Sequence, residues 1–208
     1  MTPEQILQQI HEEVQTCSKC GLHFSRKHGV SGAGPADADI MFIGEGPGFH
    51  ENETGIPFVG GSGRFLDELL ENIGMKREKV FIGNVVKCRP PGNRDPQADE
   101  LAACDPYLER QIGTINPKVI VTLGRFSMAK FMPNAKISEV HGQAMNIRGR
   151  LIVAMYHPAA ALHQRSLRPV LEADFAKLPD LIAQADAIPE YTEETNKEKS
   201  SPEQLSMF

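Results

Sequence analysis

The chain has 208 residues, 40% of them hydrophobic, and a formal net charge of −5 at pH 7. This length supports one α/β core, so we expect one domain over residues 1–188 and a flexible acidic tail over residues 189–208. No apolar run reaches the ~18 residues that span a bilayer, and the first residues do not resemble a secretory signal, which predicts a cytoplasmic protein. The charge does not exclude a nucleic-acid partner, because residues from Asp186 onward carry most of the negative balance.

Hydrophobic periodicity predicts strands that alternate with helices. We expect helices at 3–16, 64–73, 97–113, 126–131 and 169–185, and strands at 40–43, 80–86, 118–123 and 151–156. Residues 140–148 have a mixed pattern that is compatible with a hairpin. The alternation predicts a single-domain, three-layer α/β fold, with a central, mainly parallel four-stranded sheet and helices on both faces.

A loop with seven glycines, residues 44–63, joins the first predicted strand to the second predicted helix. It does not match a dinucleotide fingerprint, because Phe49 stands where the third glycine belongs, nor a P-loop, because Gly63 is followed by Arg64. Phosphate binding by residues 60–63 at the start of the helix stays open. A flexible surface insertion is the alternative, but a loop of this length in a small fold is more often functional.

Three separate segments are predicted to meet at one edge of the sheet, where parallel α/β sheets bind ligands. The glycine loop follows strand 40–43, Asn84 lies late in strand 80–86, and His157 follows strand 151–156. Taken singly, each residue also has a purely structural interpretation. Asn84 could be a core amide with its hydrogen bonds satisfied, His157 could cap the strand, and Phe58 could be an ordinary core residue. Together they predict a pocket with an amide, an imidazole, an aromatic face and backbone N–H groups.

Four cysteines occur as the pair Cys17 and Cys20, then Cys88 in a proline-rich loop, then Cys104 on a predicted helix. Four thiolates hold either Zn²⁺ or a [4Fe–4S] cluster, and the spacing alone does not decide between them. Unrelated buried cysteines are the remaining alternative.

Several motifs in this order closely resemble the family 4 uracil-DNA glycosylases, the iron–sulfur members of their superfamily: residues 44–48, 57–60, 84–91 and 157–160, with the four cysteines. The resemblance covers about residues 10–182. It implies the uracil-DNA glycosylase fold, excision of uracil from single- or double-stranded DNA, and a structural [4Fe–4S] cluster, with zinc the less favoured alternative. A related subgroup traps its product through a histidine in a basic insertion. Residues 89–96 lack that insertion, so ordinary turnover is expected.

The resemblance also implies roles for the pocket residues. Phe58 would stack on the flipped uracil, the Asn84 amide would pair with its N3–H and O4, and the Gly46 N–H and the His157 ring would hold O2. The best-known relatives carry an aspartate at the position of Gly46 that handles water. Glu51 is our preferred substitute and Glu45 the second.

Two further segments are predicted to meet DNA. Ser62, Gly63 and Arg64 begin a helix and would hold the backbone. Residues 159–168 would form a loop that enters the duplex with Leu162 and contacts phosphates with Arg165 and Arg168. An ordinary helix start is the alternative for this second segment.

The last five residues resemble the short peptides by which bacterial repair proteins bind the replication sliding clamp. The residues expected to make this contact are Gln204, Leu205, Met207 and Phe208. We otherwise expect a monomer. Two other functional classes remain as alternatives: a non-catalytic metal-cluster module that binds nucleic acid on the same fold, and a nucleotide phosphotransferase, which the missing P-loop lysine disfavours.

Overall fold

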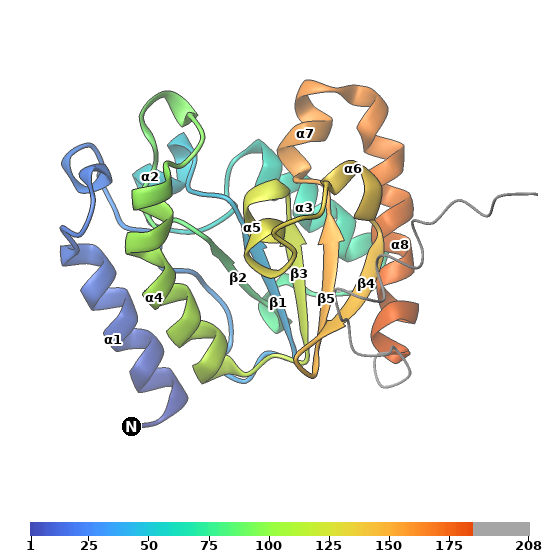
Figure 1. The fold of residues 1–208 in the computed structure, drawn as a ribbon, viewed down its shortest axis with the longest axis horizontal. Helices are drawn as coiled ribbons and strands as arrows, with labels where there is room; N and C mark the ends of the chain where they lie inside the picture. Colours follow the sequence, from blue (N-terminus) through green and yellow to red (C-terminus); the bar gives the residue numbers. More distant parts are fainter. Residues whose placement is uncertain (185–208) are drawn as a thin grey trace, which may run out of the picture.

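The structure, a computed structural model, describes residues 1–184 (Figure 1). The whole predicted tail, residues 189–208, lies outside this range, and so do the four predicted clamp-binding residues, Gln204, Leu205, Met207 and Phe208. No helix within residues 1–184 is long and apolar enough to cross a membrane.

The central sheet has five strands, in the order β2-β1-β3-β5-β4. They are β1 (Ile40–Gly44), β2 (Phe81–Asn84), β3 (Val119–Leu123), β4 (Gln143–Ile147) and β5 (Arg150–Met155). β2, β1, β3 and β5 are parallel to one another, and the edge strand β4 is antiparallel to β5.

The sheet therefore has one strand more than the four expected, the edge strand β4. The mainly parallel architecture is confirmed. Arg148 and Gly149 both have positive φ (54° and 73°), the signature of a tight two-residue hairpin turn between β4 and β5. Residues of β4 are only partly buried, so the strand lacks the continuous apolar pattern that identifies the inner strands.

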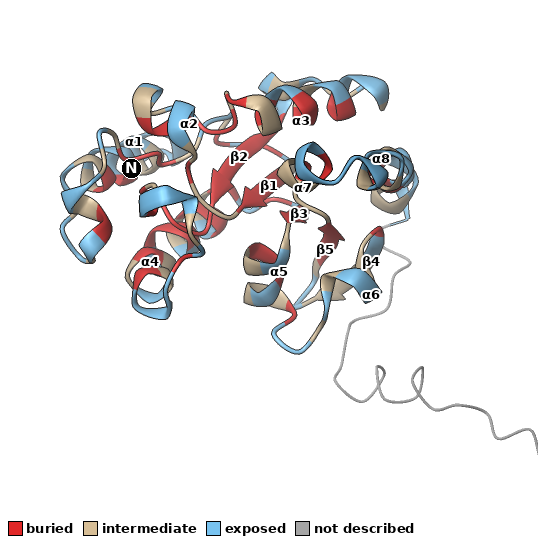
Figure 2. Cartoon of the chain, turned by 90° about the horizontal axis from the view of Figure 1, so that it is seen from above, coloured by how far each residue is buried: buried red, intermediate tan, exposed pale blue. Residues whose placement is uncertain are grey.

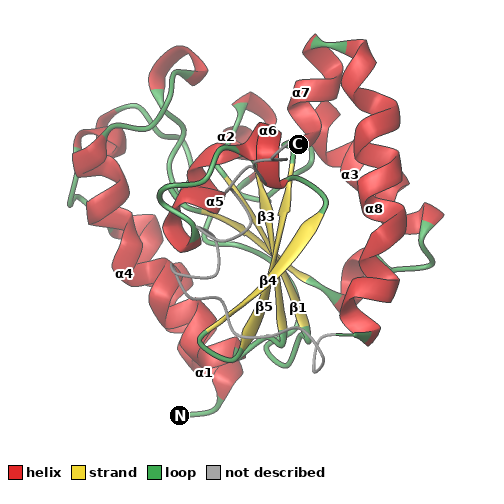
Figure 3. Ribbon diagram, turned by 45° about the vertical axis from the view of Figure 1, so that its right-hand side comes forward, coloured by secondary structure: helices red, strands yellow, loops and turns green. Residues whose placement is uncertain are grey.

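Helices cover both faces of the sheet, and Figure 3 shows the resulting three layers. They are α1 (Pro3–Thr16), α2 (Phe49–Thr54), α3 (Gly61–Asn72), α4 (Ala98–Ile115), α5 (Arg125–Phe131), α6 (Ile137–Val140), α7 (Pro158–His163) and α8 (Arg168–Ala183). The five predicted helices all form. The short helices α2, α6 and α7 are not among the predicted helices, because four to six residues are too few to show a helical period.

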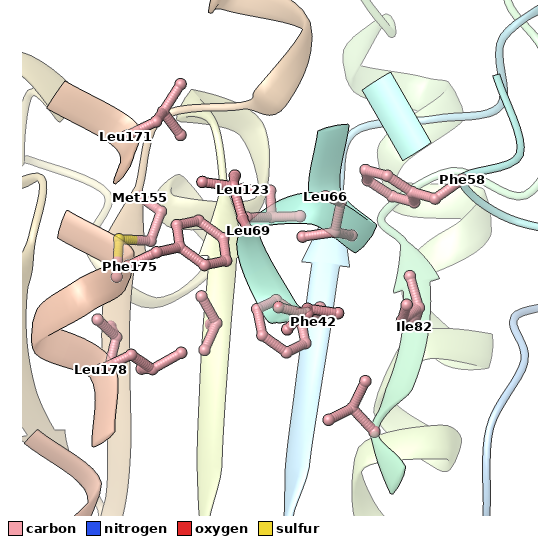
Figure 4. Close-up of a cluster of buried hydrophobic side chains, with 14 of the residues drawn as sticks. Phe42, Phe58, Leu66, Leu69, Ile82, Leu123, Met155, Leu171, Phe175 and Leu178 are labelled. Carbon is pink, nitrogen blue, oxygen red and sulfur yellow. The ribbon is translucent and has the colours of Figure 1, made fainter. Parts of the chain in front are cut away.

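Alternating strand side chains supply two separate cores. One face packs against α3, α7 and α8, with Phe42 and Phe175 stacked at 6.2 Å between ring centroids (Figure 4). The other face packs against α4 and α5, and α1 lies outside α4 (Figure 1). Apart from the edge strand β4, the strands are accordingly the most buried part of residues 1–184 (Figure 2). This rigid frame fixes the loops that leave the carboxyl ends of β1, β2 and β5.

Candidate active site

One cavity of about 470 Å³ lies at the carboxyl edge of the sheet, where the three predicted segments meet. The predicted residues that line it are Glu45, Gly46, Glu51, Phe58, Ser62, Asn84 and His157. The lining also contains residues that the sequence did not single out, among them Asn93, Arg94, Asp95 and His163. They come from the loop before α4 and the end of α7, whose polar residues looked like ordinary surface.

Asn84, the last residue of β2, reaches the floor of this cavity. Its side chain is buried, with 1% of its surface exposed, and its Oδ1 has no hydrogen-bond partner among residues 1–184. A buried amide oxygen without a partner is costly, by about 1–3 kcal/mol, and such groups are rare unless they serve a ligand. Any side chain at Gly44, its neighbour in β1, would come within 2.5 Å of this oxygen. The site therefore presents an open hydrogen-bonding group to whatever enters.

Phe58 lies beside Asn84 with its backbone in an unusual conformation. Its φ is +52°, a region that bulky residues rarely occupy, and its side chain is buried at the end of the apolar cluster near Leu66 (Figure 4). The backbone of Gly63 holds it there, since a Cβ at Gly63 would lie 1.9 Å from the Phe58 carbonyl oxygen. The Phe58 and His157 rings are stacked, with centroids 5.5 Å apart. Strain of this kind is typical of a binding surface.

His157 follows β5 and caps α7. Its Nδ1 accepts a hydrogen bond from the Ala159 N–H at 3.0 Å, so the neutral ring carries its proton on Nε2. Packing of the ring among protein atoms lowers the pKa of His157 to about 4, although the Glu51 carboxylate opposes this shift. At neutral pH the cavity thus contains a neutral imidazole that is fixed as an Nε2–H donor.

Glu51 is almost fully buried and is already satisfied by the backbone of its own loop. Its Oε1 accepts from the N–H groups of Val59 (2.9 Å) and Gly60 (2.8 Å), and its Oε2 accepts from Gly48 (3.1 Å). These bonds close the glycine loop around α2, a helix that begins just after Gly48. The carboxylate thereby holds the loop in shape.

Glu45 is half-buried and lines the same cavity. Its burial, followed by repulsion from Asp95, raises the pKa of Glu45, and Arg125 opposes the shift. Asp95 is itself paired with Arg125. No hydrogen bond of the Glu45 side chain occurs among those that the described chain makes, so this carboxylate is free to bind water or substrate.

The predicted DNA-contact residues differ in their exposure and in the partners that they already have. Arg64, Leu162 and Arg165 are exposed, and Ser62 lines the cavity. Arg168 is exposed but bridges Glu68 (2.8 Å) and Glu172 (2.9 Å) and stacks on Phe65. Gly63 is buried against Phe58, so its side of the helix packs inward. The helix α3 begins at Gly61, earlier than the predicted residue 64, so Gly61 and Gly63 both lie in its first turn.

The four cysteines surround a second, small cavity, separate from the one lined by Asn84 and His157. None forms a disulfide; Cys88 and Cys104 are buried, and Cys17 and Cys20 are partly exposed. Burial raises the pKa of Cys88, and that of Cys104 to about 11, which disfavours free thiolates. Two N–H donors point at sulfur: the Arg26 guanidinium to Cys88 and the Lys87 amide to Cys104, each at 3.4 Å. Within residues 1–184, no three or more His, Cys, Asp or Glu side chains are grouped as a site for a single metal ion.

Comparison with known proteins identifies the superfamily to which the chain belongs. A family model described as the uracil DNA glycosylase superfamily matches residues 31–178, which include all five strands and the cavity-lining loops. The chain belongs to this superfamily.

Individual relatives narrow the class to one branch. The chain is 46% identical over 187 residues to the type-4 uracil-DNA glycosylase of Sulfurisphaera tokodaii, with 84% of each chain covered. It is 48% identical to that of Saccharolobus solfataricus, covering 84% of this chain and 85% of the relative, and 42% identical to that of Thermotoga maritima, covering 87% and 97%. These identities place it in the type-4 family.

Proposed function

We propose that this chain removes uracil from DNA by hydrolysing the N-glycosidic bond and leaving an abasic site. The observation that carries the proposal is the buried, unpartnered Asn84 Oδ1 on the floor of a cavity that also contains a neutral histidine and a strained phenylalanine. The family to which the chain belongs supports the same reaction. The base must leave the stack to reach this cavity, since its glycosidic bond is inaccessible inside a duplex.

Asn84 and Phe58 select the base. The amide accepts from uracil N3–H and donates to O4, whereas cytosine presents the reverse polarity at both positions. Each buried group left unpaired by cytosine costs about 1–3 kcal/mol, so two mismatches reject it strongly. The Phe58 ring supplies a stacking surface worth about 1–3 kcal/mol that does not discriminate among bases.

His157 and Gly46 stabilise the leaving base. Negative charge grows on uracil O2 as the glycosidic bond breaks, and the Nε2–H of His157 donates to it together with the Gly46 N–H. A neutral donor suits this role because it needs no proton transfer, and its tautomer is already fixed by Ala159. Preorganised donors of this type commonly supply the largest catalytic contribution.

Water is handled by Glu45 in our proposal, and this reverses the order expected from the sequence. Glu51 accepts three backbone hydrogen bonds and is therefore assigned the task of holding the loop. Glu45 has no such bonds, faces the cavity and has a raised pKa, which are the properties of a general base.

The four cysteines are proposed to hold a [4Fe–4S] cluster. Cys17, Cys20, Cys88 and Cys104 line one cavity, and two sulfurs accept N–H groups of the kind that tune such clusters. These four cysteines would hold the cluster between the end of α1, the loop after β2 and α4, where it would stabilise the fold without taking part in the reaction. Analysis of the purified protein for about four iron atoms and matching sulfide per chain tests this, and stoichiometric zinc would overturn it.

The DNA is proposed to cross the rim formed by α3 and α7. Leu162, 51% exposed, is the wedge, and Arg165, Arg64 and Ser62 contact phosphates. Arg168 and Gly63 contribute less directly, since the first is bound to two glutamates and the second packs against Phe58. The chain acts as a monomer in this proposal, because one chain supplies every group that lines the cavity.

The C-terminal peptide is proposed to bind the bacterial sliding clamp on the strength of its sequence alone. Deletion of residues 204–208 should abolish capture by immobilised clamp and leave uracil excision unchanged. Retained capture would refute the proposal.

The main proposal is tested with single- and double-stranded oligonucleotides that contain one uracil. The purified chain should make them sensitive to alkali at the uracil position, and oligonucleotides with cytosine there should stay intact. The Asn84→Ala variant is the matched control and should lose most of the activity. Binding of DNA without any cleavage would instead support a non-catalytic module on the same fold.

A further inference from the structure

Lys87 is fully buried between the base pocket and the cysteine cavity, and the reaction as described does not use it. Only 1% of its surface is exposed. Burying an ammonium group is expensive unless each of its donors finds a partner, and most lysines avoid it by reaching water. The burial of Lys87 is therefore explained only by the groups that its ammonium group binds.

The ammonium group of Lys87 has two partners, and one of them is the backbone of Asn84, the residue proposed to read the base. The Lys87 Nζ donates to the Asn84 carbonyl oxygen at 2.9 Å and to the Gln111 Oε1 at 2.7 Å. Gln111 in turn donates through Nε2 to the Ser31 carbonyl oxygen at 2.6 Å. Lys87 thus connects the end of β2 to α4 and to the segment before β1.

Sheet geometry explains why the Asn84 carbonyl needs such a partner. β2 is an edge strand, and successive residues of a strand direct their backbone groups to opposite sides. The Val85 N–H bonds Gly44 in β1, whereas Ile82 exchanges both of its backbone bonds with Ala33 on the outer side. Asn84 shares the outward direction of Ile82, where the sheet has no further strand. The lysine supplies the donor that a neighbouring strand would otherwise provide.

The rest of Lys87 is anchored on the opposite side. Its N–H donates to the Cys104 Sγ at 3.4 Å, and its carbonyl oxygen accepts from the Val30 N–H at 2.7 Å. The backbone of Lys87 is therefore held on both of its hydrogen-bonding sides, by Cys104 and by Val30, and its side chain reaches back to Asn84.

We propose that Lys87 is a positioning residue that acts through Asn84: it fixes the backbone from which the base-reading amide projects. This inference rests on the proposed function of the pocket. It assigns Lys87 no contact with the base and no proton transfer.

The test is a double-mutant cycle between Lys87→Met and Asn84→Ala. Methionine keeps the length and apolar volume of the side chain and removes its donors. We expect Lys87→Met to lower the single-turnover rate constant of uracil excision by about 10- to 100-fold, because a small misplacement of a binding group has effects of this size. In the Asn84→Ala background the same change should alter the rate constant by less than about 2-fold, because the residue through which Lys87 acts is gone.

Affinity for free uracil, measured by calorimetry, gives a second readout that requires no catalysis. It should fall with Lys87→Met in the native background and stay the same when Asn84 is already alanine. Lys130→Met is the matched control, since Lys130 also binds α4, through Asp105 and Glu109, without contacting Asn84. Iron content and melting temperature of every variant separate a local effect from loss of the cluster or of the fold.

Equal losses in both backgrounds would overturn the inference, as would an unchanged rate in Lys87→Met or a loss that follows iron content. If Lys87→Met fails to fold, Gln111→Met replaces it; it leaves the lysine in place with one acceptor removed, and the same two-background criterion decides. A wild-type chain that binds free uracil but excises none would refute the proposed function, and the affinities would still decide the role of Lys87.

Discussion

The base pocket and the cysteine cavity lie on the two sides of Lys87 and are built on opposite principles. The pocket contains polar groups without partners: Asn84 Oδ1 has none among residues 1–184, and the Glu45 carboxylate makes no hydrogen bond there. It also contains Phe58, whose backbone has a positive φ. Around the cysteines, sulfurs receive donors from Arg26 and Lys87, and the cavity between them is small and enclosed by side chains.

This difference is the one expected between polar atoms that bind a substrate transiently and sulfur atoms that bind a permanent cofactor. An open polar group costs stability and is retained where a substrate will satisfy it. A site for a permanent group is completed by that group and contributes to folding. Substitutions in the pocket should therefore change rate more than stability, and substitutions around the cysteines should do the reverse.

The largest effect on rate is expected from His157→Ala. Loss of the Nε2–H donor should lower the single-turnover rate constant by about 10²-fold or more, since the developing charge on O2 then lacks a preorganised donor. Quenched-flow or manual single-turnover excision on a uracil oligonucleotide measures it. His163→Ala is the control, because this residue also lines the cavity but lies exposed at the end of α7.

The pH dependence adds a check on the same residue. Because the folded-state pKa is about 4 and the ordinary value is 6.5, the unfolded chain takes up a proton before the folded chain does as the pH falls. Wild-type stability should therefore decrease from about pH 6.5 towards pH 4, and the His157→Ala variant should show a smaller decrease. A variant with the same pH-dependent stability as the wild type would contradict the burial of the neutral ring.

The sequence predicts those parts of the pocket that depend on local hydrophobic patterns, and it does not predict those that depend on contacts between distant segments. The strands β1, β3 and β5 are identified by apolar runs, and with them the edge at which Asn84 and His157 meet. The roles of Glu51 and Lys87 could not be read in the same way, because each is defined by backbone partners that folding brings near. An acidic residue in a glycine loop and a lysine before a cysteine both look like solvent-exposed charges until those partners are located.

The conformation of Phe58 shows the same limit on a smaller scale. Its type predicts a buried aromatic ring, and the ring is buried. At this positive φ the Phe58 carbonyl packs against Gly63, five residues later, in the segment from which the sequence predicts phosphate binding. Sequence spacing does not distinguish a glycine that admits a ligand from one that admits a neighbouring carbonyl.

Glu45→Gln is expected to have the second-largest effect. Without a general base the rate constant should fall by about 10- to 100-fold, with melting temperature unchanged because the carboxylate has no structural bonds. The wild-type rate should decrease as the pH falls through the raised pKa of Glu45, since the base must be ionised, and the variant should lose this dependence.

Glu51→Gln provides the comparison within the loop. The amide nitrogen of glutamine would face the Gly48 N–H, so we expect a loss of stability of about 1–3 kcal/mol by chemical denaturation. If Glu51→Gln instead left stability unchanged and removed the pH dependence of the rate, the water-handling role would return to Glu51.

Gly63→Ala should have a smaller effect that arises from geometry. A Cβ there meets the Phe58 carbonyl at 1.9 Å, so the backbone must shift and carry the stacking ring with it. We expect the rate constant to fall by about 10-fold and the affinity for free uracil to fall with it. Gly113→Ala on α4, where a Cβ meets nothing within 4 Å, is the control and should stabilise the chain by about 0.5–1 kcal/mol. Unchanged uracil affinity in Gly63→Ala would show that Phe58 is not held by this contact.

The smallest effect on rate is expected from Cys20→Ser, and it is the direct test of the contrast between the two sites. Loss of one ligand should lower iron content and melting temperature, whereas the rate constant per folded, iron-loaded molecule should change by less than about 2-fold. Ser18→Ala, in the same loop between the two cysteines, should leave all three quantities unchanged. A Cys20→Ser protein with full iron content and a slow rate would break the contrast, because the cysteine site would then act on the chemistry without passing through stability.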